Sequence, residues 1–359
     1  MQPVPLFLNA TLHALSAATL TGAELNPHTG AEVPPGLLPP GTTLIDGLDT
    51  LVLAGRFDDT QTVQAVAGFA LGTTTVSVFE TFIRVVGGLL GLADALRTVN
   101  QLVFLKCVES AAKVADALDV AFADGPVPYP RVDLARNVGV GMPWFPQGCT
   151  SVADAGTIFF ELEWLAARTG NPRYQRRADG LLDALGAYTW VKIGSGAPCS
   201  AEQFTAGAGG DSWYEMLLKT GKRPRLTKRF LAHHDWGSMR ATGEGGHLLC
   251  IWPIYVAEAG LLRGDCAQLA TAKGCHPEPE AAEMLWALND SAGTSVARTN
   301  FAEHCQRQFG YGRPEWHHDP LQHSWVAAET LKYLYAPYPC GAKEVTGTLS
   351  TEAHCRRYL

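Results

Sequence analysis

The sequence predicts an all-α fold built from antiparallel helix pairs. Amphipathic stretches follow one another after residue 42, and short segments containing glycine and proline separate them. Strand signals are sparse, since only Thr73–Val78 looks β-prone. Hydrophobic residues make up 47% of the 359 residues and charged residues 18%, which is enough to bury a sizeable core and excludes global disorder.

The helices are expected within a single domain that covers residues 43–359, since no linker divides it. Residues 1–42 are expected to form an irregular N-terminal segment, because residues 26–42 are rich in proline and glycine. Two helical stretches stop at a Thr-Gly pair, which favours a repeated helix hairpin. The stretches with apolar residues at helical spacing are Phe79–Leu96, Ala153–Arg168, Ser212–Lys219, His247–Leu262 and Ala327–Tyr335.

The charge balance and the cysteines exclude several classes of function. With 28 basic and 35 acidic residues the formal net charge is −7, so the chain lacks the basic surface that nucleic-acid binding needs. The nine cysteines include no CxxC pair, so a structural zinc site is not expected. Their odd number fits one or two disulfides plus buried thiols, or no disulfide.

No clear membrane or export signal stands in the chain. Its first residues are mildly apolar but lack a basic region, which makes a poor secretory signal. No run of about 18 consecutive apolar residues occurs, so no transmembrane helix is expected. Sequons at Asn9 and Asn289 matter only if the chain enters the secretory pathway, and chance explains them about equally well.

Four carboxylates stand inside apolar helical stretches, where an acidic side chain is costly unless it is paired or functional. They are Glu80, Glu161, Asp211 and Glu329. Each one alone is explained by a solvated helix face or, for Asp211, by an N-cap. Together they suggest a shared acidic pocket, and paired carboxylates are what glycoside hydrolysis requires.

Other signals are weaker. The adjacent histidines at 233–234 and 317–318 cannot face one ion from a helix, and the HExxH spacing of a zinc site is absent. The glycine-rich residues 206–211 do not follow a strand signal, so a phosphate-binding loop is not expected.

At these same positions the sequence resembles the family 47 glycoside hydrolases, the class I α-1,2-mannosidases. Seven segments match in the family's order. Some details resemble the processing enzymes of the endoplasmic reticulum (ER) and Golgi, and others the ER degradation-enhancing branch, so both branches stay open. The matching segments are residues 43–55, 76–91, 154–174, 204–219, 245–254, 327–335 and 350–354.

The resemblance implies an (α/α)7 barrel of helix hairpins with its site at the axis. It also implies removal of terminal α-1,2-linked mannose from high-mannose N-glycans on glycoproteins, with inversion of configuration and a bound Ca²⁺. A location in the ER or Golgi lumen follows from the resemblance alone.

The resemblance also assigns roles to single residues. Glu80 matches the general acid, Asp211 matches a catalytic aspartate, and Thr351 matches the threonine whose hydroxyl and carbonyl oxygens bind Ca²⁺. Residues expected to contact the sugar are Arg84, Glu161, His247, Trp325, Glu329 and Glu352.

The general base is the point where the sequence departs from the family. That base is the glutamate of an Arg-Pro-Glu motif followed by Glu-Ser, and Glu315 is the expected counterpart. Only 13 residues separate Glu315 from Glu329, so we expect the barrel to be incomplete, lacking at least a helix pair there. Residues 297–315 also resemble an earlier, non-catalytic Pro-Glu block, in which case the base is missing. A mannose-binding protein without activity and a truncated product without function are the alternatives.

Overall fold

The computed structural model describes residues 24–26, 29, 31–33, 36–53, 59–97, 100–236, 238–239, 246–254, 266–268, 279–287, 291–300, 328 and 330. The longer helices are α2 (Thr42–Leu53), α3 (Asp59–Gly68), α5 (Gly87–Leu96), α6 (Gln101–Ala117), α8 (Phe159–Thr169), α9 (Pro172–Ala184), α10 (Asp211–Thr220), α11 (Pro224–His233), α14 (Pro279–Ala287) and α15 (Ser291–Asn300). Shorter helical segments are α4 (Val78–Glu80), η1 (Thr81–Val86), η2 (Asp119–Phe122), α7 (Val152–Gly156) and η3 (Gly246–Ile254).

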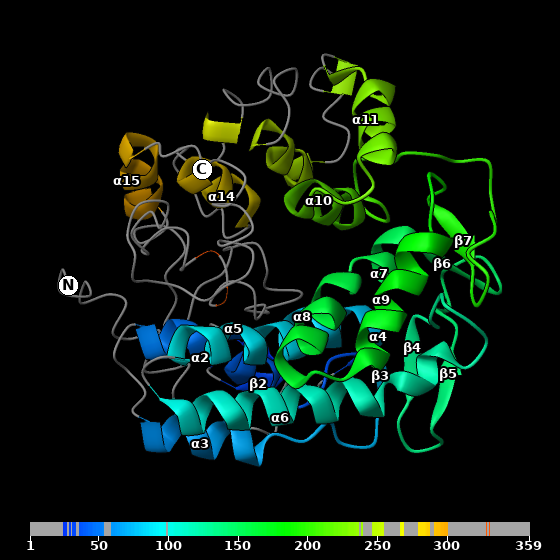
Figure 1. The fold of residues 1–359 in the computed structure, drawn as a ribbon. Helices are drawn as coiled ribbons and strands as arrows, with labels where there is room; N and C mark the ends of the chain where they lie inside the picture. The colour runs from blue at the N-terminus through cyan, green and yellow to red at the C-terminus, as the bar shows by residue number, and fades with distance from the viewer. Residues whose placement is uncertain are drawn as a thin grey trace.

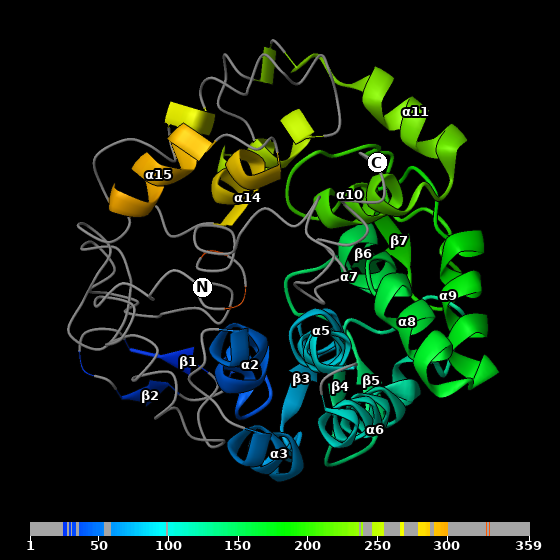
Figure 2. The ribbon, with the colours of Figure 1, turned by 60° about the vertical axis from the view of Figure 1, so that its left-hand side comes forward.

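The helices form a ring of two layers (Figures 1 and 2). In Figure 2, α2, α5, α8, α10 and α14 lie nearer the centre of the ring, and α3, α6, α9, α11 and α15 lie outside them. Helices that follow one another pack as pairs, α5 with α6, α8 with α9, α10 with α11 and α14 with α15. The predicted barrel of helix hairpins is therefore the observed architecture. The segment between Glu315 and Glu329, where we expect a helix pair of the family to be missing, lies outside the described residues apart from residue 328.

Several helix ends carry the caps that their sequences provide. The side chain of Asn100 accepts hydrogen bonds from the backbone N–H groups of the first turn of α6, and Asn171 does the same for α9. The two Thr-Gly stops are confirmed, because Gly170 ends α8 and Gly221 ends α10 in the left-handed conformation that glycine adopts without strain.

Short strands are the main departure from the all-α prediction. Only β3 was predicted, within Thr73–Val78; the others are two or three residues long, too short to show an alternating pattern. The β1–β2 pair lies within the predicted irregular segment 1–42, and the boundary at residue 42 stays a prediction. The antiparallel sheets are β1–β2 (Glu24–Leu25, Glu32–Val33), β3–β4–β5 (Thr75–Ser77, Arg131–Asp133, Val138–Val140) and β6–β7 (Cys149–Ser151, Trp190–Lys192).

Three predicted helices differ in detail. The stretch Phe79–Leu96 is helical throughout, but its middle, η1, is a π-helix. Ala153–Arg168 is divided into α7 and α8, and Ser151 caps the first of them. The stretch beginning at His247 is a 3₁₀-helix up to Ile254, and Pro253 lies inside it, where it cannot donate an α-helical hydrogen bond. The last predicted helix, Ala327–Tyr335, lies outside the described residues apart from residues 328 and 330.

The core lies between the two layers of helices. On α5, the side chains of Leu89, Leu90 and Leu92 are fully buried. Gly88, on the same helix, allows close packing on α2, because a Cβ there would come within 3.1 Å of the Ile45 carbonyl oxygen. In the described part of the chain, no helix is long and apolar enough to cross a bilayer.

Candidate active site

Glu80 and Arg84 form the first half of the site. The strand β3 runs directly into α4, and the Ser77 side chain caps this turn by accepting a hydrogen bond from the Glu80 N–H at 3.3 Å. Arg84 lies one turn further on and donates from Nε to Glu80 Oε2 at 2.5 Å. Its guanidinium also lies 3.7 Å from Asp46 Oδ2 on α2. Glu80 and Arg84, to which the resemblance assigns acid catalysis and substrate contact, are therefore joined by a hydrogen bond.

The π-helical segment η1 begins directly after Glu80 and contains Arg84. The Thr81 hydroxyl donates to the Ser77 carbonyl oxygen at 2.6 Å and holds the junction between α4 and η1. Single turns of π-helix inside longer helices occur frequently at functional sites. Here the turn lies where Arg84 meets both Glu80 and Asp46.

Asp211 is the first residue of α10. The N-cap is Gly210, so the N-cap interpretation of Asp211 is corrected; its Oδ1 accepts the backbone N–H of Ser212 at 2.9 Å instead. Gly210 must be glycine, since a Cβ would come within 2.5 Å of the Thr205 carbonyl oxygen. The pKa of Asp211 is raised to about 6, chiefly by burial; the hydrogen bond from Ser212 opposes this rise, and the charges of Glu280 and Asp154 contribute to it.

Asp154 connects the Glu80 end of the site with Asp211, and the sequence analysis missed it. The strand β6 runs directly into α7, and Ser151 at the junction accepts the Asp154 N–H at 3.0 Å while its hydroxyl donates to Asp154 Oδ2. Burial raises the pKa of Asp154, and the charge of Glu80 adds to that rise. The sequence signal was a carboxylate in the first turn after a serine, which is also the pattern of an ordinary helix start.

Glu280 is the second residue that the sequence analysis missed. It lies in the first turn of α14 and is near enough to Asp211 for its charge to raise the pKa of that carboxyl. The signal in the sequence was another Pro-Glu pair besides Pro314–Glu315. This pair is Pro279–Glu280, and Glu283 follows it three residues later. Four carboxylates, each from a different helix, thus form a series in which each raises the pKa of a neighbour or has its own pKa raised by one. They are Glu80 on α4, Asp154 on α7, Asp211 on α10 and Glu280 on α14.

Glu161 on α8 lies in the core. Only 7% of the residue is exposed, and its Oε2 has no hydrogen-bond partner. Oε1 lies 3.7 Å from the position that a Cβ on Gly87 would take. Burial raises the pKa of Glu161 to about 7. Helix α8 is held against α5 by Arg168, whose Nε donates to Asp94 at 2.7 Å.

The other predicted site residues cannot be placed. Glu315, Trp325, Glu329, Thr351 and Glu352 lie outside the described residues, and their roles stay predictions. His247 lies in η3, where only its backbone is described.

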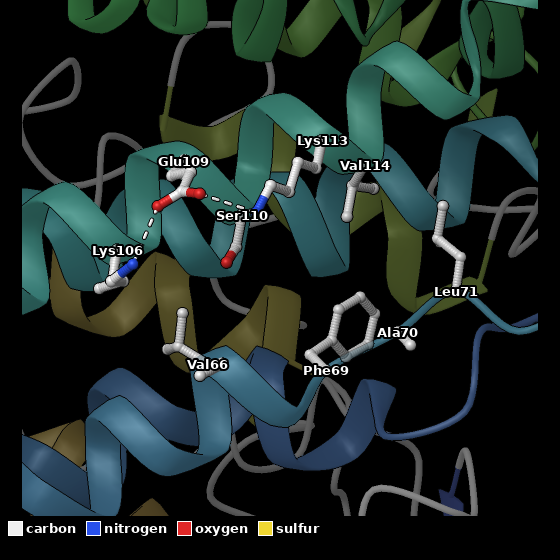
Figure 3. A pocket seen from close by; sticks show the side chains of 10 residues that line it. Val66, Phe69, Ala70, Leu71, Lys106, Glu109, Ser110, Lys113 and Val114 are labelled. Carbon is white, nitrogen blue, oxygen red and sulfur yellow. Dashed lines mark hydrogen bonds and ion pairs between the residues drawn. The ribbon is translucent and has the colours of Figure 1, made fainter.

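A pocket of about 350 Å³ lies away from these carboxylates, between α3 and α6 (Figure 3). Phe69 and Leu71 form part of its apolar wall, and Glu109 on its rim is paired with Lys106 and Lys113. It contains none of the carboxylates described above, so it is separate from the candidate active site.

Comparisons with known proteins agree with the resemblance, and the matched region contains the first four of the seven segments. The sequence profile of glycosyl hydrolase family 47 matches residues 19–234, more than half of the chain. The chain belongs to glycosyl hydrolase family 47. The α-1,2-mannosidase from Trichoderma reesei, at 19% identity, shares its fold with a TM-score of 0.70 over 96% of both chains. The predicted family and its α/α barrel are therefore confirmed.

Curated relatives of this family cover part of the chain. The mannosyl-oligosaccharide 1,2-alpha-mannosidase MNS1 of Arabidopsis thaliana is 32% identical over 231 residues, which are 59% of this chain and 39% of that protein. The endoplasmic reticulum mannosyl-oligosaccharide 1,2-alpha-mannosidase of Saccharomyces cerevisiae is 29% identical over 272 residues, 65% of this chain and 47% of that protein. The chain thus spans less than half the length of these relatives.

Proposed function

We propose that this chain is an inverting, Ca²⁺-dependent α-1,2-mannosidase that removes terminal mannose from high-mannose N-glycans. The observation that carries the proposal is the series of neighbouring carboxylates Glu80, Asp154, Asp211 and Glu280. Family membership and the names of the relatives, which are mannosyl-oligosaccharide mannosidases, support the same activity.

Inverting glycoside hydrolysis needs one carboxyl group that holds a proton and another that activates water. Glu80 is assigned the proton transfer to the leaving oxygen, and Arg84 fixes its orientation through the hydrogen bond to Oε2. Asp211, whose pKa is raised to about 6, can hold or release a proton near neutral pH and takes part in acid–base transfer.

For the general base, the structure favours a residue that the sequence did not suggest. Glu280 lies near enough to Asp211 for its charge to raise the pKa of that carboxyl, and it follows a proline as the family's base does. Glu315, the base expected from the sequence, lies outside the described residues. We propose Glu280 as the base and retain Glu315 as the competing assignment.

The Ca²⁺ site is proposed from the resemblance and from the chemistry of the donors. Thr351 would hold the ion through its hydroxyl and carbonyl oxygens, and Ca²⁺ would supply positive charge to the hydroxyl groups of the bound sugar. Both of these donors are oxygens, which suits a hard cation. Among the described residues, no group of three or more His, Cys, Asp or Glu side chains could hold a metal.

A location in the secretory pathway is part of the proposal. The structure pairs Cys149 with Cys199 and Cys250 with Cys266, and it leaves Cys107 as a buried free thiol. Disulfides persist in oxidising compartments such as the ER lumen, so this pairing supports that location. It also agrees with one of the arrangements expected from the odd number of cysteines.

The test is mannose release from a high-mannose glycan by the purified full chain, with and without EDTA. We expect release that stops on chelation and returns with added Ca²⁺, and we expect β-mannose as the first anomer by NMR. Glu80→Gln should reduce turnover by about 10²-fold or more and spare glycan binding. Folded wild-type protein that binds the glycan without releasing mannose would instead favour the mannose-binding alternative.

A further inference from the structure

A buried lysine joins α10 to α14 directly behind the catalytic carboxylates. Lys219 donates from Nζ to Glu283 Oε1 at 3.1 Å and also contacts Glu215 Oε1. The side chains of Lys219, Glu215 and Glu283 are only 3%, 12% and 6% exposed. Ion pairs this deep in a protein are costly to break, because the remaining charge stays buried without its partner.

The spacing along both helices connects this ion pair to the site. On α10, Asp211, Glu215 and Lys219 follow at intervals of four residues and therefore share one helix face. On α14, Glu280 and Glu283 lie three residues apart and share a face in the same way. The contact between Lys219 and Glu283 and the proximity of Glu280 to Asp211 are therefore both formed between the same two helix faces. Figures 1 and 2 both show α10 and α14 side by side.

Without a cation, these two faces would repel each other. They bring together Asp211, Glu280, Glu215 and Glu283, and Asp154 approaches Asp211 from α7. Burial raises the pKa of Glu215, the charges of Glu283 and Asp211 add to this, and Lys219 opposes it. Lys219 contacts both Glu215 and Glu283, so its positive charge offsets part of this repulsion.

We infer that Lys219 is a positioning residue, which holds α14 against α10 through Glu283 and so keeps Glu280 opposite Asp211. The inference rests on the proposed function, because Glu280 and Asp211 matter as a pair only if both serve the reaction. Lys219 itself is not assigned a contact with the substrate.

The test uses the double variant Lys219→Met with Glu283→Gln. It removes one positive and one negative charge, so the net charge of the cluster is unchanged and the contact between α10 and α14 is lost. The matched control is Lys222→Met with Glu163→Gln. That ion pair, at 2.7 Å, also links the region of α10 to another helix, α8, but it is 39% and 21% exposed.

We expect kcat for mannose release to fall by about 10- to 100-fold in the first double variant, because small displacements of catalytic groups have effects of this size. KM should change less. If Glu280 moves away from Asp211, its negative charge no longer raises the pKa of Asp211, and that pKa should fall. The acid limb of the pH profile of kcat should then move to lower pH. The control should keep kcat within about twofold and leave the profile unchanged.

Several outcomes would overturn the inference. A folded double variant with wild-type kcat and pH profile would show that Lys219 serves stability alone. If the double variant does not fold, Glu283→Gln alone, which keeps an oxygen to accept the Lys219 proton, must show the same change in smaller degree. A wild type that releases no mannose overturns the proposed function instead. The pKa of Asp211, measured by carboxyl NMR and assigned with Asp211→Asn, then decides, and an equal value in wild type and double variant overturns the inference.

Discussion

Glu161 shows how strongly burial inside this barrel raises the pKa of a single carboxylate. The sequence placed it in an apolar helix and the resemblance assigned it to the sugar pocket. In the structure it lies buried in α8 with Oε2 unpartnered, so it favours the neutral form until the pH is raised through about 7. Its ordinary pKa is 4.5. Its contribution to stability is therefore fully present below pH 4.5 and is lost as the pH rises through 7.

Glu161→Gln tests this at the level of one residue. The amide stays neutral, so the variant should gain stability relative to wild type as the pH rises from 5 to 8, by an amount on the order of 2 kcal/mol. Thermal unfolding followed by circular dichroism at pH 5, 6, 7 and 8 measures the difference.

Glu163→Gln, on the same helix but in the half-exposed pair with Lys222, is the control, and its difference from wild type should stay small at each pH. If the gap between Glu161→Gln and wild type were the same at pH 5 and pH 8, the raised pKa would be wrong.

At the scale of elements, the site depends on close packing between α7 and α10. Gly156 at the end of α7 faces Trp213 on α10, and the Thr157 hydroxyl just beyond it donates to Ser212 Oγ at 2.9 Å. Because Trp213 and Ser212 directly follow Asp211, this packing sets the position of the aspartate that we propose to be catalytic. Asp154, on α7, is held by the same contact.

Gly156→Ala should separate these two helices. The new Cβ would come within 2.5 Å of Trp213 Cε3 and 2.9 Å of Leu185 Cδ1, so the packing must shift. We expect a loss of about 1–3 kcal/mol in the free energy of unfolding together with reduced kcat. Urea denaturation and the mannose-release assay measure both quantities. Gly186→Ala is the control, since no atom lies within 4 Å of its new Cβ, and a Gly156→Ala protein as stable and active as this control would contradict the packing argument.

At the scale of the whole molecule, the sequence predicts those features that depend on interactions between neighbouring residues, such as helices and their ends. The helix hairpins followed from apolar spacing, and the stops at Gly170 and Gly221 followed from the left-handed conformation that glycine allows. Glu80 and Asp211 were found because a carboxylate is conspicuous in an apolar stretch, and because the segments around them resemble the family. The glycine-rich residues 206–211 gave no specific prediction beyond the expected absence of a phosphate-binding loop, and the structure shows that Gly210 among them is the N-cap of α10.

Features that depend on tertiary contacts were missed. The three-residue strands exist because distant segments pair, as β3 does with β4, and such pairing leaves no periodic signal in so few residues. Glu280 was overlooked because its significance lies in the approach of α14 to α10, far along the chain from Asp211. The Arg-Pro-Glu sequence at 313–315 drew attention to Glu315 instead.

The identity of the general base is the central claim about this protein, and it can be tested directly. Mannose release from a high-mannose glycan should be compared for wild type, Glu280→Gln and Glu315→Gln, each checked for folding by circular dichroism. We predict that Glu280→Gln lowers kcat by about 10²-fold or more, while Glu315→Gln stays close to wild type. Full activity in Glu280→Gln, with activity lost in Glu315→Gln, would contradict the proposed series of carboxylates and return the base to Glu315.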